Sequence, residues 1–267
     1  MAVNRDNSIR AMLTVVLVMF LATGCVTVSD SRFSREKDRD EAVENYVQLA
    51  TAYISQGNLD RANKHLERAL ELKPDDAAAL SAMALLQSSD GEARLAEESF
   101  RKAISSDGDY TRGRVYFGAF LYGEGRYREA RDQFREASAD TKYPDRASVF
   151  FNLGMSEERL DNNEAAIAAY RRSVELSRGE PKSLLALSRT LVKAGDYSSA
   201  SRYYSRLATL MAQNPRYRHS PESLLTGIRI ARHFDERNRE SSLALQLRNN
   251  FPESVEYQQY RVLISND

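Results

Sequence analysis

The side chains best suited to catalysis are few in this sequence and lie far apart. The three histidines, His65, His219 and His233, share no spacing that would place them on one metal ion or beside one nucleophile. The helical register puts His65 on an exposed side, so we interpret it as a surface histidine. No HExxH, paired CxxC, GxSxG or Walker A motif is present. We therefore predict no catalytic residue, no metal site and no cofactor; the alternative is an enzyme whose site these motifs do not reveal.

Charged residues give no better indication of a reactive site. The acidic pairs Glu97–Glu98 and Glu157–Glu158 fall on predicted helices without an evident partner set, so we interpret them as solvated faces. The chain has 38 basic and 38 acidic residues. Nucleic-acid binding needs a surplus of Lys and Arg against phosphates, and a balanced chain offers none. We predict neither a nucleic-acid partner nor a small-molecule substrate.

Cys25, the only cysteine, follows a segment typical of a targeting signal. Arg5 and Arg10 precede an uncharged apolar run at 11–22, and small residues stand at 22–24. The run is shorter than the ~20 residues that span a bilayer, but it suits the apolar region of a signal peptide. Because no second cysteine is present, Cys25 cannot form an internal disulfide. The alternative is a plain secreted protein with a free thiol, which is a liability in an oxidising compartment.

The four residues Ala22-Thr23-Gly24-Cys25 resemble a bacterial lipobox, although Ala22 stands where Leu is usual. This resemblance implies a lipoprotein signal peptide at 1–24 and acyl chains on Cys25. Several chains on one residue would anchor the protein stably. The absence of Asp after the cysteine implies the outer membrane, by the sorting rule of Gram-negative lipoproteins. Residues 26–40 are polar and charged, so we predict a lipidated cysteine and flexible tether at 25–40.

A repeated pattern occupies the rest of the chain. Its most regular feature is an alanine, followed four residues later by a large apolar or aromatic side chain. Spacings of four and three place such residues on one stripe of a helix. The alanines recur roughly every 34 residues, an interval typical of helical repeat proteins. They are Ala62, Ala96, Ala130, Ala166 and Ala200.

Each alanine follows a turn, and another amphipathic stretch precedes that turn. Four of the five turns carry a glycine in the same register, which suits the left-handed end of a helix. This pattern resembles the tetratricopeptide repeat (TPR), whose period is about 34 residues. We predict an all-α, right-handed superhelical solenoid of about six helix-turn-helix units over 41–264. The expected units are 43–76, 77–110, 111–146, 147–180, 181–219 and 220–253, with a C-terminal helix at 254–264.

A solenoid of this kind has a concave groove lined by the first helix of each unit. The register predicts side chains there that are more apolar than a solvated face, and exposed apolar patches mark binding sites. An amphipathic helix or an extended segment of another protein is the expected ligand. The predicted groove residues are Val47, Thr51, Ile54, Leu85, Val115, Tyr122, Phe151, Met155, Leu185 and Arg189.

The chain from residue 39 onward resembles the PilF/PilW lipoproteins of type IV pilus biogenesis. The resemblance is carried by RDEAVENYVQLATAYISQGNLDRA at 39–62, ASVFFNLG at 147–154 and LLTGIRIARHFDERN at 224–238. It implies a pilotin: a non-enzymatic scaffold on the periplasmic face of the outer membrane that binds the pilus secretin subunit and promotes its localisation, assembly or stability. The alternative is a TPR lipoprotein that recruits peptidoglycan hydrolases or proteases.

Overall fold

The computed structural model describes residues 32–214 and 216–265. The predicted signal peptide and the lipidation site Cys25 lie outside the described residues. The chain divides into two units, 1–42 and 43–267, and the repeat array belongs to the second. Among the described helices, none combines the length and the apolar character that crossing a bilayer requires.

The predicted tether differs from the structure in its second half. Helix α2 begins at Arg32 and runs to Ser55, so residues 32–40 are helical, and the expectation of a flexible tether is wrong for them. Residues 35–40 are exposed, and Arg39 pairs with Glu36 at 3.7 Å and with Asp40 at 3.5 Å. This stretch contains neither Gly nor Pro, and charge pairs three residues apart support a solvated helix.

The described residues form helices and no strand. The helices after α2 are α3 (Leu59–Leu72), α4 (Ala77–Ser89), α5 (Ala93–Ser106), α6 (Thr111–Gly123), α7 (Tyr127–Ala139), α8 (Arg146–Arg159), α9 (Asn163–Leu176), α10 (Pro181–Lys193), α11 (Tyr197–Gln213), α12 (Pro221–His233), α13 (Arg237–Asn250) and α14 (Val255–Ser265).

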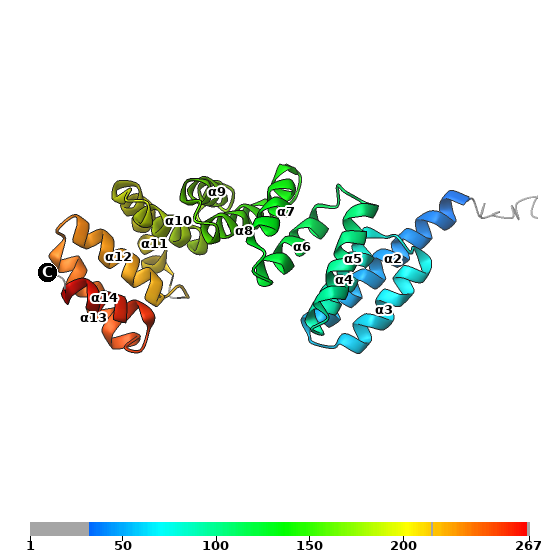
Figure 1. Cartoon of the computed structure of the whole chain (residues 1–267), viewed down its shortest axis with the longest axis horizontal. Helices are drawn as coiled ribbons and strands as arrows, with labels where there is room; N and C mark the ends of the chain where they lie inside the picture. Colours follow the sequence, from blue (N-terminus) through cyan, green and yellow to red (C-terminus); the bar gives the residue numbers. More distant parts are fainter. Residues whose placement is uncertain (1–31, 215, 266–267) are drawn as a thin grey trace, which may run out of the picture. The chain divides into compact units, whose positions relative to one another are not determined.

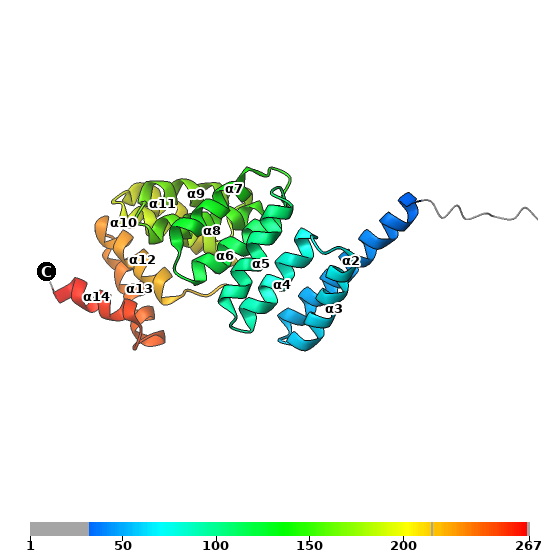
Figure 2. The same cartoon turned by 45° about the vertical axis from the view of Figure 1, so that its right-hand side comes forward.

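These helices form consecutive hairpins, which Figures 1 and 2 show from two sides. The two helices of a hairpin pack on each other, as in α4–α5, α6–α7 and α8–α9. First helices of neighbouring hairpins are also in contact, as in α4–α6, α6–α8 and α10–α12. The prediction of an all-helical TPR solenoid is confirmed.

The turn inside each hairpin has the same backbone conformation, whichever residue occupies it. Gly57, Gly91, Gly125 and Gly195 have φ between 72° and 83°, the left-handed region. Asp161 takes this place in the fourth hairpin, with φ 57°, and Asp235 in the sixth, with φ 55°. The next amide then bonds back across the helix end, for example Asn162 N to Glu157 O at 2.9 Å. This is the Schellman closure that satisfies carbonyls at a helix C-terminus.

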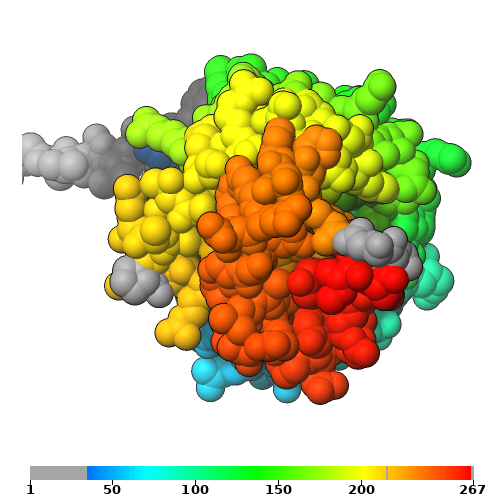
Figure 3. All heavy atoms as spheres, turned by 90° about the vertical axis from the view of Figure 1, so that its left-hand side faces the viewer, coloured from blue at the N-terminus to red at the C-terminus, as the bar shows by residue number. Residues whose placement is uncertain are grey.

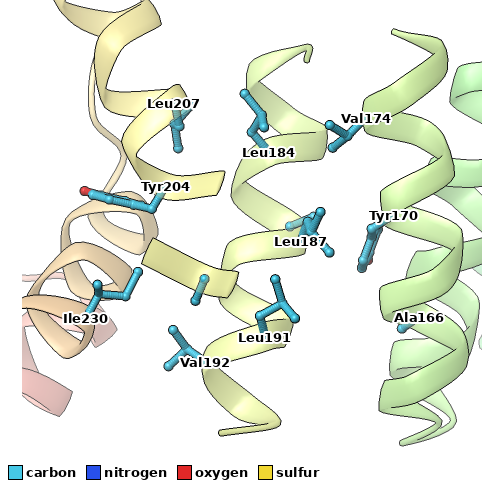
Figure 4. Packing of buried hydrophobic residues seen from close by; sticks show 12 residues of the cluster. Ala166, Tyr170, Val174, Leu184, Leu187, Leu191, Val192, Tyr204, Leu207 and Ile230 are labelled. Atoms are coloured by element: carbon cyan, nitrogen blue, oxygen red, sulfur yellow. The ribbon is translucent and has the colours of Figure 1, made fainter. Parts of the chain in front are cut away.

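The repeated stripe of the second helices forms the core. All five marker alanines are fully buried, and so are the large side chains that follow them: Leu66, Phe100, Phe134, Tyr170 and Tyr204. Figure 4 shows how the units interlock, with Leu187 and Leu191 of α10 between Tyr170 of α9 and Tyr204 of α11. Burying a large apolar side chain contributes roughly 1.5–3 kcal/mol, so this stripe accounts for much of the stability.

The last hairpin departs from the pattern as a terminal unit does. Glu240 stands where the marker alanine would be, and it pairs with Arg232 at 2.9 Å. Helix α14 then covers the sixth hairpin, with Tyr257, Tyr260 and Leu263 packed on its core. Figure 3 looks onto this end, where α12 and α13 (orange) and α14 (red) lie in front and α11 (yellow) lies beside them.

Candidate functional site

The structure brings half of the predicted groove residues to one pocket. Tyr122 of α6, Phe151 and Met155 of α8, and Leu185 and Arg189 of α10 line a pocket of about 450 Å³. All five are partly exposed. They meet because first helices of successive hairpins lie next to each other, so a stripe on each helix faces the same side.

The other five predicted residues do not line this pocket. Val47, Ile54, Leu85 and Val115 are half-buried and pack against the cores of the first three hairpins. Thr51, also half-buried, donates its hydroxyl to Val47 O at 2.8 Å. Their role as binding residues stays a prediction.

Aromatic and aliphatic side chains form the wall of the pocket. The Phe151 ring lies 5.7 Å from the ring of Tyr170, centre to centre, and Leu185 and Ala186 face it from α10. A smaller recess of about 100 Å³ between α6 and α8 shares Tyr122 and Met155 with the pocket. These apolar surfaces are partly open to solvent, so a ligand that covers them gains free energy from burial.

An ion-pair triad crosses the polar part of the pocket. Arg189 bonds with Glu158 of α8 through Nη2 and with Glu222 of α12 through Nη1. Tyr170 donates its hydroxyl to Glu158 Oε2 at 2.9 Å. Burial and the Glu158 carboxylate raise the pKa of Tyr170, so it stays protonated and serves as a donor. One arginine therefore joins three successive first helices.

Two further cations lie on aromatic faces at the edge of the pocket. Lys182 Nζ lies 5.4 Å from the centre of the Phe151 ring, and it pairs with Glu180 at 3.4 Å. Arg159 Cζ lies 4.6 Å from the centre of the Tyr127 ring and bonds with its hydroxyl. Within the part of the chain that the structure describes, no carboxylate forms an ion pair with Arg159.

The interpretation of the acidic pairs as solvated faces is wrong for three of the four residues. Glu157 is buried, accepts from Asn162 Nδ2 at 2.8 Å and pairs with Arg135 at 3.2 Å. Glu158 belongs to the triad with Arg189, and Glu97 pairs with Arg126 at 2.6 Å.

Each of these three carboxylates has an arginine partner that is distant in sequence. These partners lie 22 residues from Glu157, 31 from Glu158 and 29 from Glu97, so local spacing does not reveal them. Glu97 also pairs within its own helix with Arg101, four residues on, at 2.7 Å.

For Glu158, the available signal was the repeat itself. A period of about 34 residues aligns Glu158 of α8 with Val192 of α10, three residues after Arg189. The repeat therefore places Glu158 and Arg189 at similar levels of two neighbouring first helices.

The histidines have separate surroundings. We expected His65 on an exposed side, but it is half-buried, because its ring stacks on that of Tyr53 with the ring centres 5.5 Å apart. His219 bonds with Ser223 Oγ at 2.9 Å, and burial lowers the pKa of its imidazole. His233 stacks on Tyr197 at 3.9 Å. Among residues 32–214 and 216–265, no group of three or more His, Cys, Asp or Glu side chains is placed to hold a metal ion.

Two family models of the tetratricopeptide repeat match the chain, one over residues 43–87 and the other over 121–181. Among curated proteins, the type IV pilus assembly protein PilF of Pseudomonas aeruginosa is 38% identical over 255 residues, which cover 95% of this chain and 98% of PilF. An uncharacterized protein of Haemophilus influenzae is 25% identical over 171 residues, 62% of this chain and 92% of that protein.

Solved structures give the same result. A structure of Pseudomonas aeruginosa PilF superposes with a TM-score of 0.74 at 36% identity, covering 84% of this chain and 99% of that one. A crystal structure of PilW, described as a widely conserved type IV pilus biogenesis factor, superposes with a TM-score of 0.66 at 26% identity, covering 82% of this chain and 97% of that one.

Proposed function

Because the chain belongs to the PilF/PilW family of TPR proteins of type IV pilus biogenesis, we propose that it acts as the pilotin of a pilus secretin. In this role it is a lipoprotein of the outer membrane that faces the periplasm. It binds the secretin subunit and promotes its localisation, assembly or stability. The observation that carries the proposal is the similarity to PilF over almost the whole chain.

The physical basis of this role is recruitment without catalysis. A lipid on Cys25 holds the repeat array at the membrane surface. A groove that binds one secretin subunit then raises the concentration of that subunit where the ring assembles. The pocket of α6, α8 and α10 supports the proposal, because it offers partly exposed aromatic and aliphatic walls to a partner chain.

The groove is tested by charged replacements within it. Phe151→Asp and Met155→Asp are expected to reduce co-purification of the secretin from detergent-solubilised envelopes at least tenfold, because a partner side chain would then desolvate a charge. Leu245→Glu is the matched control, since Leu245 lies outside the pocket on α13 and is 49% exposed. Circular dichroism must show unchanged helicity in all three. Undiminished secretin recovery with the two groove variants would exclude this pocket as the contact.

The anchor is tested by Cys25→Ser. This variant is expected in the soluble periplasmic fraction, and secretin multimers in the envelope are expected to fall as they do in the deletion strain. Unchanged membrane fractionation would refute lipidation. Secretin multimers that persist in the deletion strain, together with recovery of peptidoglycan hydrolases or proteases in place of secretin, would favour the adaptor function instead.

A further inference from the structure

Some charged side chains that line the pocket of α6, α8 and α10 are paired with each other, and others are not. Its lining contains the carboxylates Glu158 and Glu222 and the cations Arg159, Lys182 and Arg189. Both carboxylates bond with Arg189, so neither is available to a basic ligand without breaking the triad. The two other cations have no carboxylate partner among the described residues of the lining.

The two cations remain accessible to a ligand. Lys182 pairs with Glu180, but their side chains are 46% and 44% exposed, and such pairs contribute about 0–1 kcal/mol. The guanidinium of Arg159 rests on Tyr127, whose hydroxyl is a neutral partner. A carboxylate that approaches either cation therefore gains an ion pair, and it replaces only the weak pair with Glu180 or the neutral hydroxyl of Tyr127.

The backbone positions on α8 beside these cations suggest a spacing for the ligand. Lys182 lies over Phe151, near the middle of α8, whereas Arg159 is the last residue of α8. A helix rises ~1.5 Å per residue, so the backbone positions of Phe151 and Arg159 are about 12 Å apart along the axis of α8. An extended chain covers that length in about four residues. Met155 and Leu185 line the apolar surface of the same pocket, which at about 450 Å³ can take one large side chain with part of its backbone.

We propose that this pocket binds an acidic segment of the partner protein in which one large apolar side chain is flanked by carboxylates about four residues apart. The apolar side chain lies between Phe151 and Leu185, and the carboxylates lie near Lys182 and Arg159. This inference rests on the proposed function for the identity of the partner, the secretin subunit, and it adds the chemistry of the segment that is bound.

The test uses the full chain and overlapping synthetic peptides that cover the secretin subunit of the same organism. Calorimetric titration is expected to give the tightest binding for a peptide with an aromatic or large aliphatic residue between acidic residues. Affinity for that peptide is expected to fall at least tenfold in Arg159→Glu/Lys182→Glu and in Leu185→Asp. Replacing the acidic residues of the peptide by their amides is expected to have a similar effect.

A matched control separates the pocket from net charge. Lys64→Glu/Lys102→Glu makes the same change in charge at positions of α3 and α5 outside the pocket and is expected to leave affinity unchanged. An equal loss in this control, or tight binding of a peptide that lacks acidic residues, would overturn the proposal while leaving the pilotin role intact. If no secretin peptide binds and secretin multimers also survive deletion of the gene, the pilotin role itself fails.

Discussion

Two tyrosines show how one repeat position serves different purposes at the scale of a residue. Tyr170 and Tyr204 both stand four residues after a marker alanine, and both are fully buried. The hydroxyl of Tyr170 bonds with Glu158, which ties the core to the pocket. The hydroxyl of Tyr204 has no hydrogen-bond partner among the described residues. Burial raises the pKa of Tyr204, and the nearby Ser223 hydroxyl partly offsets this rise. That hydroxyl is hydrogen-bonded to His219, so it does not satisfy Tyr204.

We expect opposite effects from removing these two hydroxyl groups. Tyr204→Phe deletes a buried, unpaired polar group and is expected to raise the free energy of unfolding by about 1 kcal/mol. Tyr170→Phe removes a hydrogen bond to a carboxylate and is expected to lower the free energy of unfolding by about 1–2 kcal/mol. Urea unfolding followed by circular dichroism measures both. A loss of stability in Tyr204→Phe would show that its hydroxyl has a partner in solution.

At the scale of a helix pair, how closely the two helices of a hairpin approach each other depends on the residue of the first helix that faces the large core side chain of the second. A methyl group on Gly154 of α8 would lie 2.6 Å from Cδ1 of Tyr170 on α9, and one on Gly118 of α6 would lie 2.8 Å from Cε1 of Phe134 on α7. These glycines therefore allow the first helix to lie directly on the aromatic ring of the second helix.

Gly154→Ala is expected to lower the free energy of unfolding by about 1–2 kcal/mol. Overpacking costs about 1–3 kcal/mol, and the better helix propensity of alanine offsets at most ~1 kcal/mol of it. Gly123→Ala is the control, because Gly123 ends α6 and a methyl group added to it would meet no other atom within 4 Å. It is expected to be neutral or stabilising in the same urea assay. Equal effects of the two substitutions would contradict the packing.

The hairpin turn gives a second prediction at the element scale. Asp161 has φ 57° and is 86% exposed, so its backbone conformation matters more than its side-chain contacts. Asp161→Val is expected to lower the thermal midpoint and to cost about 1–2 kcal/mol, because a β-branched residue is strained in the left-handed region. Asp161→Asn removes the same charge but tolerates this conformation. Its midpoint should stay near that of the unsubstituted protein; a comparable fall would point to the Lys193 ion pair as the cause.

At the scale of the whole repeat array, ion pairs join one hairpin to the next. Arg126, which precedes α7, pairs with Glu97 of α5 at 2.6 Å and with Glu129 at 2.5 Å. Lys193 pairs with Asp161 at 3.0 Å, and Arg189 joins α8, α10 and α12. Since each hairpin contacts its neighbours, stability in such arrays depends on these interfaces as well as on the hairpins themselves.

The Arg126 network predicts a dependence of stability on pH. Hydrogen bonds from Arg126 lower the pKa of Glu97 and of Glu129 below 4.5. The stabilisation is therefore complete above about pH 4.5 and is lost as pH falls through the native pKa. Glu97→Gln is expected to be less stable than the unsubstituted protein by up to about 1 kcal/mol at pH 7, with the difference shrinking at pH 3. Urea midpoints at the two pH values measure this; a difference that persists at pH 3 would exclude the charge as its source.

The sequence by itself determined the repeat architecture and the side of each helix that is buried. The recurrence of the marker alanines, the large residues after them and the turn glycines was sufficient, because each hairpin packs by local spacings of three and four residues that recur at a regular period. Even the Asp residues at two turns obey this register. The resemblance to the PilF/PilW family was also visible in the sequence, and the comparisons confirm it.

Only the tertiary structure decided which groove residues meet and how charges near them are paired. Arg189 reaches Glu158 and Glu222, which lie 31 and 33 residues away, and Lys182 lies over a ring on another helix. Hydrophobic periodicity shows the direction in which a side chain points, but it does not measure the spacing between helices that places a cation on a ring or closes an ion pair. The helix over residues 35–40 was missed for a related reason, because exposed residues form no apolar stripe that would reveal a helix.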